Sequence, residues 1–238
     1  MIRKFRRYAR LIIEKLLFFR GFSIIPSDGT IDFQREVLIK KFNIQRIIDV
    51  GVNEGQFSLL IRKYFKSIPI TAFDPDPRIA ESIKTLNLKN HIFHNIGLGD
   101  KNEIMSFNLW PIEGGSSSFK TLSKHGEDWT YFKNSEIPNV DVEVKCLDSY
   151  DFLEDKIYLK IDVQGFEIEV LRGSLNLIND KIRIVEIEVP ALEIYQDSSN
   201  LIQVHEFLTN NGFQLSSIHS SRFHKIGVAD FDCIYYKI

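Results

Sequence analysis

The sequence contains little cysteine and no long apolar run. Its 238 residues include two cysteines, Cys146 and Cys233, which stand far apart in no metal-ligand or redox spacing. We therefore expect two core thiols in a reducing, cytoplasmic protein. The nearest candidate for a membrane span, residues 11–19, contains Glu14 and Lys15 and is shorter than the about 20 residues that a span needs. No small-residue cleavage site follows it, which argues against a secretory signal peptide.

The chain also has little net charge, −2, but its charges are unevenly distributed. Residues 1–20 hold seven basic residues and one acidic residue, a charge of +6, whereas the remainder holds 23 basic and 31 acidic residues, a charge of −8. The body lacks the excess of Lys and Arg that a phosphate-binding face needs. This distribution excludes nucleic acid as the expected partner of the body.

Apolar residues in the basic segment recur at three- and four-residue steps, which predicts an amphipathic helix. One interpretation is peripheral contact of residues 1–20 with an anionic membrane, at its inner face, through the basic side chains. The other, commoner in proteins, is a helix packed on the body with its basic face in solvent. The apolar residues are Phe5, Tyr8, Ile12, Leu16 and Phe19.

From residue 46 onward, apolar strand-like runs alternate with helical stretches, after a predicted helix over 32–42. This rhythm predicts an α/β fold with a parallel sheet and helices on both faces. The last two runs are joined too closely for a crossover helix, which predicts an antiparallel pair. Between 103 and 146 the alternation fails, and we interpret this stretch as an insertion over the edge that carries the site. The predicted strands are 46–50, 70–73, 92–94, 157–161, 182–189, 214–219 and 231–236.

The segment Asp49-Val-Gly-Val-Asn-Glu-Gly-Gln-Phe-Ser58 follows the first strand and opens a helix. Gly51 and Gly55 let the backbone approach a ligand where a Cβ would clash, at the carboxyl edge of the sheet. Glu54 would repel the pyrophosphate of a dinucleotide. S-adenosylmethionine, with a sulfonium, an ammonium and no phosphate, suits such an acidic loop better. The cofactor candidates here are Asp49, Gly51, Asn53, Gly55, Phe57 and Ser58.

The next two strand ends extend this pattern. Asp74, followed by Pro75, ends the second strand where a carboxylate can accept hydrogen bonds from both ribose hydroxyls, and Asp76 is expected to cap the following helix. In His94-Asn-Ile-Gly-Leu-Gly-Asp100, Asn95 and Gly97 are expected on the adenine side. An acid after the second strand also occurs in dinucleotide folds, so an NAD-dependent oxidoreductase remains the alternative. The ordered set of features favours S-adenosylmethionine.

The fourth strand continues into Tyr158-Leu-Lys-Ile-Asp-Val-Gln-Gly-Phe-Glu-Ile-Glu-Val-Leu-Arg-Gly173. With the preceding motifs, it resembles the FkbM-type family of S-adenosylmethionine-dependent methyltransferases, from about residue 47 to the end. The family usually shows Lys-Ile-Asp-x-Glu-Gly-x-Glu, so this chain departs from it at Gln164. The resemblance implies a class I, Rossmann-like fold with a seven-stranded, mostly parallel sheet, and O-methylation, often of a sugar hydroxyl in a glycan or natural product. We expect a methyltransferase domain over 31–238, preceded by the helix and turn of 1–30.

Transfer of a methyl group to a hydroxyl requires alignment of two atoms and loss of the hydroxyl proton. Asp162 is the first candidate for the base or for the sulfonium side; alternatively it caps the helix that starts near Gly165. Glu188, on one strand face with Glu186, is the second candidate, with a salt bridge to a Lys of the insertion as the alternative. Asp162 and Glu188 could also hold a divalent cation, which we do not favour because the ligand spacing is not tight.

The remaining candidates are weaker. On the helix after Asp162, Glu167 is expected to turn towards the site and Glu169 to be solvated. His125 and His224 are alternative bases, because imidazole titrates near neutral pH. A different class of function is a non-catalytic cofactor-fold module on a membrane surface, which only the departure at Gln164 supports. The insertion offers side chains that could grip a sugar or simply pack locally: Trp110, Ser116, Ser117, His125 and Trp129.

Removal of the basic segment tests the membrane interpretation. The membrane interpretation predicts that the full chain floats with anionic liposomes and that the protein starting at residue 21 floats less, because the Lys and Arg side chains would attract anionic lipid. Neutral liposomes serve as the control. Equal flotation of the two proteins would contradict the interpretation.

Overall fold

The computed structural model describes residues 29–110, 117–130, 134, 137–224 and 227–238. The chain divides into two compact units, residues 1–37 and 38–238. The helix predicted within residues 1–20 lies outside the described residues, so its membrane or packing role stays a prediction. Helix α2 (Ile31–Phe42) carries Asp32 in its first turn, and the carboxylate of Asp32 pairs with Arg35 at 2.8 Å.

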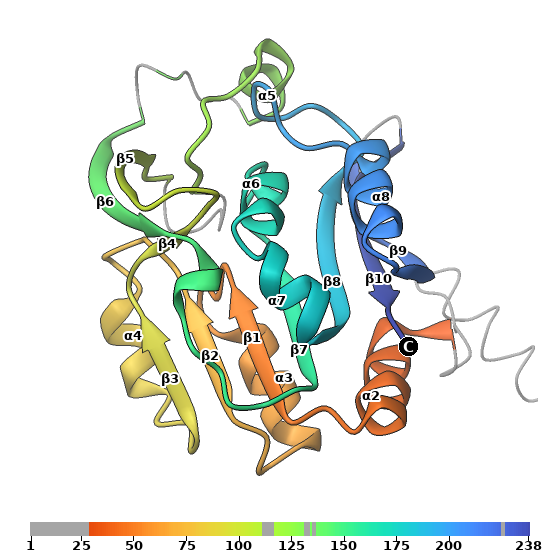
Figure 1. Ribbon diagram of the computed structural model, residues 1–238. Helices are drawn as coiled ribbons and strands as arrows, with labels where there is room; N and C mark the ends of the chain where they lie inside the picture. Colours follow the sequence, from red (N-terminus) through yellow and green to blue (C-terminus); the bar gives the residue numbers. More distant parts are fainter. Residues whose placement is uncertain (1–28, 111–116, 131–133, 135–136, 225–226) are drawn as a thin grey trace, which may run out of the picture. The chain divides into compact units, whose positions relative to one another are not determined.

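The second unit contains a seven-stranded sheet with the order β3-β2-β1-β7-β8-β10-β9 (Figure 1). Strands β3, β2, β1, β7 and β8 run parallel, and β10 is antiparallel to both β8 and β9. The predicted mostly parallel sheet with a terminal antiparallel pair is confirmed. The strands are β1 (Arg46–Val50), β2 (Ile70–Phe73), β3 (His91–His94), β7 (Ile157–Ile161), β8 (Ile182–Pro190), β9 (Gln214–His224) and β10 (Gly227–Tyr236).

The central strands are apolar because both faces of the sheet are covered. In β1, Ile47 and Ile48 are fully buried, and in β7 only Lys160 interrupts a run of fully buried residues. Figure 1 shows α6 and α7 in front of the sheet and α3 behind it, as expected of helices on both faces. The helices are α3 (Gln56–Tyr64), α4 (Ala80–Thr85), α6 (Glu167–Arg172), α7 (Leu175–Asp180) and α8 (Leu201–Asn210).

The stretch interpreted as an insertion contains more regular structure than the sequence indicated. A three-stranded sheet of order β4-β6-β5 joins β4 (Gly97–Leu98), β6 (Asn139–Lys145) and β5 (Glu103–Asn108). Helix α5 (Lys124–Thr130) also lies in this stretch, and a short 3₁₀ helix, Leu147–Ser149, directly follows it. Strands β5 and β6 are largely exposed, so they lack the apolar runs that identified the central strands. Their detection would have needed alternation of polar and apolar residues, as in Val140, Val142 and Val144.

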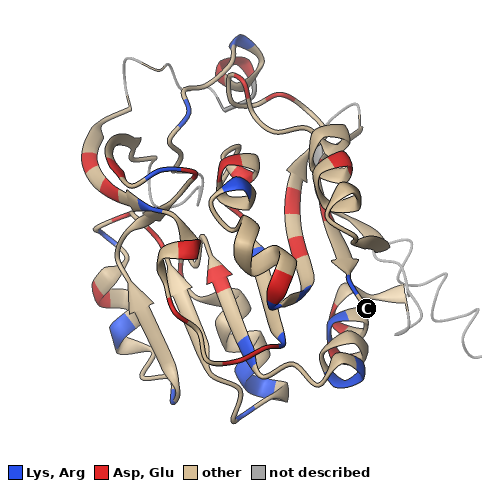
Figure 2. Ribbon diagram, viewed as in Figure 1, with Lys and Arg blue, Asp and Glu red and all other residues tan. Residues whose placement is uncertain are grey.

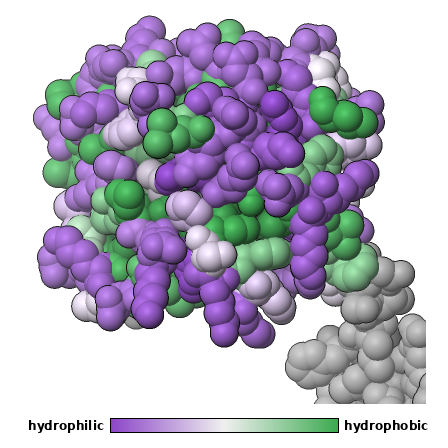
Figure 3. Space-filling view, turned by 60° about the horizontal axis from the view of Figure 1, so that its bottom comes forward, coloured by the Kyte–Doolittle hydropathy of each residue, from purple (hydrophilic) through white to green (hydrophobic). Residues whose placement is uncertain are grey.

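The surface of the described part is mainly polar. Figure 3 shows one face of the molecule on which hydrophilic side chains surround a smaller group of hydrophobic ones. Among the described residues, no helix combines the length and apolar character needed to cross a bilayer.

The buried core of the large sheet should carry the stability of the second unit. Leu159, in the middle of β7, is 0% exposed, whereas Leu153, in the preceding loop, is 90% exposed. We expect Leu159→Ala to lower the free energy of unfolding by about 2–5 kcal/mol, because the truncation removes packed apolar groups and leaves a cavity. The matched variant Leu153→Ala should change it by less than about 0.5 kcal/mol. Urea denaturation measures both, and equal effects would contradict the assignment of β7 to the core.

Candidate active site

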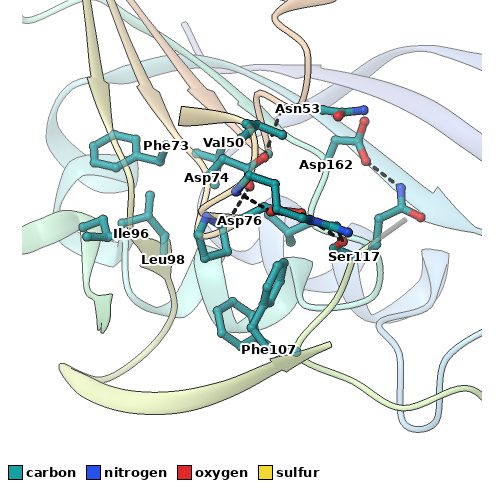
Figure 4. Close-up of a pocket in the computed structure, with 18 of the residues that line it drawn as sticks. Val50, Asn53, Phe73, Asp74, Asp76, Ile96, Leu98, Phe107, Ser117 and Asp162 are labelled. Atoms are coloured by element: carbon teal, nitrogen blue, oxygen red, sulfur yellow. Dashed lines mark hydrogen bonds and ion pairs between the residues drawn. The ribbon is translucent and has the colours of Figure 1, made fainter. Parts of the chain in front are cut away.

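A cavity of about 270 Å³ lies where β1, β2 and β7 end (Figure 4). Its wall contains Val50 from β1, Phe73 from β2 and Asp162 directly after β7. Open α/β sheets bind ligands at this carboxyl edge, since loops and side chains from several strands converge there. The volume is near the lower end of the about 300–1,000 Å³ typical of small-molecule sites.

The loop after β1 forms one side of the cavity. Gly51 has φ +79°, and a Cβ at this position would stand 1.7 Å from the backbone oxygen of Asp162. Only glycine permits that approach between the β1 and β7 loops. Asn53, also at positive φ, donates its backbone N–H to Asp74 Oδ2 at 3.0 Å. The loop is thus tied both to the end of β7 and to the acid after β2.

Asp74 is a buried acid of the wall whose two oxygens are both held by the backbone. It is 8% exposed, and its two oxygens accept backbone N–H groups of Asn53 and Asp76 at 3.0 and 2.9 Å. Asn95 fixes the same turn by donating to the carbonyls of Asp74 and Asp76 at 2.8 and 3.1 Å. Burial raises the pKa of Asp74 to about 6, despite these hydrogen bonds. The carboxylate is therefore ionised at neutral pH and keeps acceptor capacity for ligand hydroxyls.

Asp76 does not cap a helix, so that expectation is wrong. Helix α4 begins at Ala80, and Asp76 instead accepts the backbone N–H of Arg78 at 2.9 Å within the preceding turn. Its carboxylate also pairs with the Arg78 guanidinium at 2.6 Å. Arg78 in turn donates to Ser117 Oγ at 3.1 Å (Figure 4), which ties the insertion to the β2 loop.

The charges of the wall select the kind of ligand. Arg78 is the single cation among the described lining residues, and it is already paired with Asp76. Such a wall disfavours a pyrophosphate and suits a cationic ligand that carries hydroxyls. The acids of the wall are Glu54, Asp74, Asp76 and Asp162; the apolar groups, which suit a planar ring, include Phe73, Ile79, Ile96, Leu98 and Phe107.

Asp162 lies in the wall with its side chain 30% exposed. Lys160 Nζ lies 2.9 Å from Oδ2, and Gln164 Nε2 donates to Oδ1 at 2.8 Å. Burial acts to raise the pKa of Asp162, but the Lys160 charge and the hydrogen bonds outweigh it and lower that pKa. The cavity therefore contains an ionised carboxylate beside the loop that follows β1.

Asp162 does not cap α6, so this alternative is wrong. Glu167, 1% exposed, accepts the backbone N–H groups of Gly165 and Val163 at 2.9 and 3.4 Å and so holds the loop before α6. Burial raises the pKa of Glu167 to about 7. Glu169 is not simply solvated as expected, because it pairs with Lys120 of the insertion at 3.1 Å.

A row of charged residues lies within the sheet next to the cavity. The strand register sets Lys160 between Asp49 of β1 and Glu186 of β8, and Figure 2 shows red segments on both of these strands. Asp49 and Glu186 are 0% exposed, and Asp49 accepts a hydrogen bond from Ser58 Oγ at 2.7 Å. Tyr158 donates to Glu186. The pKa of Lys160 is raised because the neighbouring carboxylates outweigh its burial, so the ammonium persists.

Glu188 lies behind Asp162, with its side chain 13% exposed, and does not line the cavity. It accepts hydrogen bonds from Gln164 Nε2 at 2.8 Å and Ser221 Oγ at 3.2 Å. Its ion-pair partner is Arg222 of β9 at 3.9 Å, not a Lys of the insertion as the sequence suggested. Burial, followed by the charge of Asp162, raises the pKa of Glu188 to about 9.

The structure divides the cofactor candidates into two groups. The candidates in the cavity wall are Gly51, Asn53, Asp74, Pro75, Gly97 and Asp162. The others support the wall or lie beside it: Asp49, Gly55, Phe57, Ser58 and Asn95. Their positions are those expected of residues that shape a loop rather than touch a ligand.

The catalytic candidates also separate. Asp162 lies in the wall and Glu188 behind it, but the structure does not bring His125 to the cavity, because this residue is exposed on α5. Of the insertion candidates, Trp110 and Ser117 line the cavity. Ser116 and the side chains of Trp129 and His224 lie outside what the structure describes.

Sequence reasoning missed Lys160, Arg78 and the aromatic residues Phe107 and Phe119 of the wall. Lys160 had a usable signal, since a lone ammonium in an apolar parallel strand needs buried carboxylates. Among the described residues, no group of three or more His, Cys, Asp or Glu is placed to hold a metal ion.

The sheet order and the cavity at its carboxyl edge define the class I methyltransferase fold. A family model of the methyltransferase FkbM domain matches residues 49–215, more than half of the chain. This chain therefore belongs to the FkbM methyltransferase domain family, and its domain is that of an S-adenosylmethionine-dependent methyltransferase.

Individual relatives agree with this assignment. The chain is 28% identical over 142 residues to Methyltransferase 1 of Beauveria bassiana (strain ARSEF 2860), a match that covers 53% of this chain and 57% of that protein. It is 25% identical over 197 residues to Methyltransferase sdnD of Sordaria araneosa, over 71% of this chain and 74% of the relative. The solved FkbM methyltransferase of Methylobacillus flagellatus KT shares the fold, with TM-score 0.52 and 14% identity, over 82% of this chain and 44% of that chain.

Asp74 gives a direct test of the cavity as the cofactor site. We expect calorimetry to show micromolar binding of S-adenosylhomocysteine, and Asp74→Asn to weaken it about ten- to a hundredfold, because hydrogen bonds to a charged group contribute about 1.5–3 kcal/mol. The wild-type affinity should fall as the pH drops below about 6, where Asp74 gains a proton. Glu81→Gln is the matched control, since that side chain is 83% exposed on α4. Binding of NAD without binding of S-adenosylhomocysteine would contradict the assignment.

Proposed function

We propose that this protein transfers a methyl group from S-adenosylmethionine to a hydroxyl, of a sugar in a glycan or natural product. The observation that carries the proposal is the position of Asp162, whose carboxylate lies in the wall of the cavity with the Lys160 ammonium 2.9 Å away. This neighbouring charge lowers the pKa of Asp162 and favours its ionised form. A neutral hydroxyl is a weak nucleophile, so its methylation requires a group that accepts its proton.

The residues present fit the cofactor. When bound, S-adenosylmethionine supplies an electrophilic methyl group on a positively charged sulfur. Asp74 would accept hydrogen bonds from the ribose hydroxyls, and Asn53 and Asn95 keep that carboxylate in place. The apolar side of the cavity, with Ile96 and Leu98, would hold the adenine, and the acids of the wall would face the positive charge.

Asp162 would act on the acceptor. Its Oδ2 is engaged by Lys160 and its Oδ1 by Gln164, so the carboxylate is held in one orientation at the cavity. It takes the proton of the hydroxyl as the oxygen forms its new bond to carbon. General-base assistance of this kind contributes about 10²–10⁴-fold to the rate.

The sugar acceptor is supported by the aromatic side of the cavity. Phe107, Trp110 and Phe119 line it, and their planes suit the C–H faces of a sugar ring. Ser117 adds a hydroxyl within the same wall. Both cysteines, Cys146 and Cys233, are free thiols, which supports a cytoplasmic location for the reaction.

The alternatives are less well supported. The acidic wall disfavours the pyrophosphate of NAD, because four carboxyl groups face one arginine that is already paired. A non-catalytic module was suggested only by the missing carboxylate at Gln164. Since Asp162 supplies a charged carboxylate in the wall, the amide at 164 does not remove the base.

Loss of the base should slow transfer strongly while the cavity remains formed. We expect Asp162→Asn to lower the rate of label transfer from labelled cofactor to a lipid-linked oligosaccharide fraction by about 10²–10⁴-fold. Calorimetry with S-adenosylhomocysteine checks that the cavity remains formed, and exposed Asp151→Asn serves as the control. The product label should survive alkali, as a methyl ether does and a methyl ester does not. Transfer at the wild-type rate by Asp162→Asn would refute the role of Asp162.

A further inference from the structure

Gln164 joins two carboxyl groups that lie next to each other. Its Nε2 donates to Asp162 Oδ1 and to Glu188 Oε2, both at 2.8 Å. An amide nitrogen carries two hydrogens, so it can serve both acceptors at once. Its Oε1 accepts from Arg222 Nη2 at 3.4 Å, which fixes which end of the amide faces the carboxyl groups.

The backbone of Gln164 is also held in an unusual position. Its φ of +55° lies in the left-handed region, which costs energy for a residue with a side chain. Its carbonyl accepts a hydrogen bond from Ser118 Oγ at 2.7 Å, and Gly165 follows it at φ +103°. These backbone conformations and the hydrogen bond from Ser118 hold the loop so that the Gln164 side chain points at the two carboxyl groups.

The surroundings of the two carboxyl groups are unequal. Asp162 has the Lys160 ammonium at 2.9 Å, whereas Glu188 has Arg222 only at 3.9 Å. The Arg222 guanidinium is also bonded to Asp230. Two adjacent carboxyl groups that share little positive charge do not both ionise, and the proton stays on the one with the weaker cation. The charged and titratable groups near the pair are Asp49 of β1, Lys160 of β7, Glu167 of α6, Arg222 of β9, and Asp230 and Asp232 of β10. Glu186 of β8 acts on Lys160.

We propose that Asp162 and Glu188 form a proton-sharing pair in which Glu188 holds the proton, and that Gln164 is the positioning residue that keeps them together. The acid of Glu188 donates to the Asp162 carboxylate, which leaves the charge on the oxygen atoms at the cavity. This inference rests on the proposed role of Asp162 as the base. It assigns a function to Glu188, which does not touch the cavity, and to the residue at which this chain departs from the family pattern.

The proton balance of the pair is simple. The O–H bond of the acceptor breaks and its proton goes to Asp162, while an electron pair of the oxygen forms the new bond to the methyl carbon. The bond between that carbon and the cofactor sulfur would break, and its electron pair would leave on the sulfur of the product S-adenosylhomocysteine. Glu188 keeps its own proton throughout, so the pair gains one proton, which it releases to water before the next turnover. A second negative charge at Glu188 would oppose this cycle by repelling the charge of Asp162.

The first experiment measures the proton itself and requires no activity. Infrared difference spectra between wild type and Glu188→Gln should show the carbonyl band of a protonated carboxylic acid at neutral pH, which disappears as the pH rises through about 9. In Asp162→Asn the band should disappear at a lower pH than in the wild type, because the charge of Asp162 no longer opposes ionisation of Glu188. A spectrum that contains only carboxylate bands for Glu188 at neutral pH would overturn the pair.

The pH dependence of folding stability gives an independent test of whether Glu188 is protonated. The pKa of Glu188 is raised from 4.5 to about 9 in the folded chain, so its contribution to stability is present below pH 4.5 and is lost as the pH rises to about 9. Glu188→Gln is neutral at every pH and keeps a donor. The melting temperature of this variant minus that of the wild type should therefore increase as the pH rises from 5 to 9. A difference that is constant with pH would contradict the protonated state.

The role of Gln164 is tested through the pH profile of transfer. Gln164→Met removes both donors, and Gln164→Glu replaces them with a third carboxyl group. Both should move the acidic limb of kcat/KM to higher pH and lower kcat/KM at neutral pH about ten- to a hundredfold, since the charge of Asp162 loses a hydrogen bond. Exposed Gln214→Glu should leave the profile unchanged.

The outcomes separate the pair from the proposed function. If Gln164→Glu transferred label faster than the wild type, a carboxylate at position 164 would itself serve as a base. This result would overturn the role of Gln164 as a positioning residue. If the carbonyl band assigns the proton to Glu188 but Asp162→Asn transfers label normally, the proposed base fails while the proton-sharing pair stands. If Asp162→Asn is inactive but Glu188 shows no protonated band, the base stands and the pair fails.

Discussion

The structure depends on one buried cation, Lys160, in the central strand of the sheet. Its ammonium lies 2.9 Å from Asp162, and the strand register places it between Asp49 and Glu186. A charge taken out of water needs partners of opposite sign. Lys160 of β7 has such partners in β1 and β8, so these three strands are joined by more than their backbone ladders. The same ammonium decides that Asp162, the acid at the cavity, is ionised.

The site follows from that constraint. With its charge fixed, Asp162 is held by Gln164 on one side and by the close approach of Gly51 on the other. Glu188 lies behind it with a raised pKa, because burial and the neighbouring charge oppose its ionisation. The cofactor half of the cavity is built separately, around Asp74, so binding and proton transfer can be altered independently.

Much of the fold was predictable because local sequence patterns indicate its strands and its site loop. The seven strands of the large sheet were predicted from their apolar runs, and the site loop from the glycines and the acids at the strand ends. The second sheet escaped because β5 and β6 are largely exposed and lack apolar runs. The capping roles assigned to Asp76 and Asp162 were wrong, since a carboxylate near a helix start has the same local signature whether it binds a turn, a lysine or the helix.

The sequence by itself determined the order of strands along the chain, the positions where only glycine fits, and the family to which the motifs point. Only the tertiary structure decided which carboxyl groups are charged, which lie in the cavity and which lie behind it. The physical reason is that a pKa depends on neighbours within a few ångströms. For Glu188 those neighbours are Asp162, Arg222 and Asp230, which come from the loop after β7, from β9 and from β10.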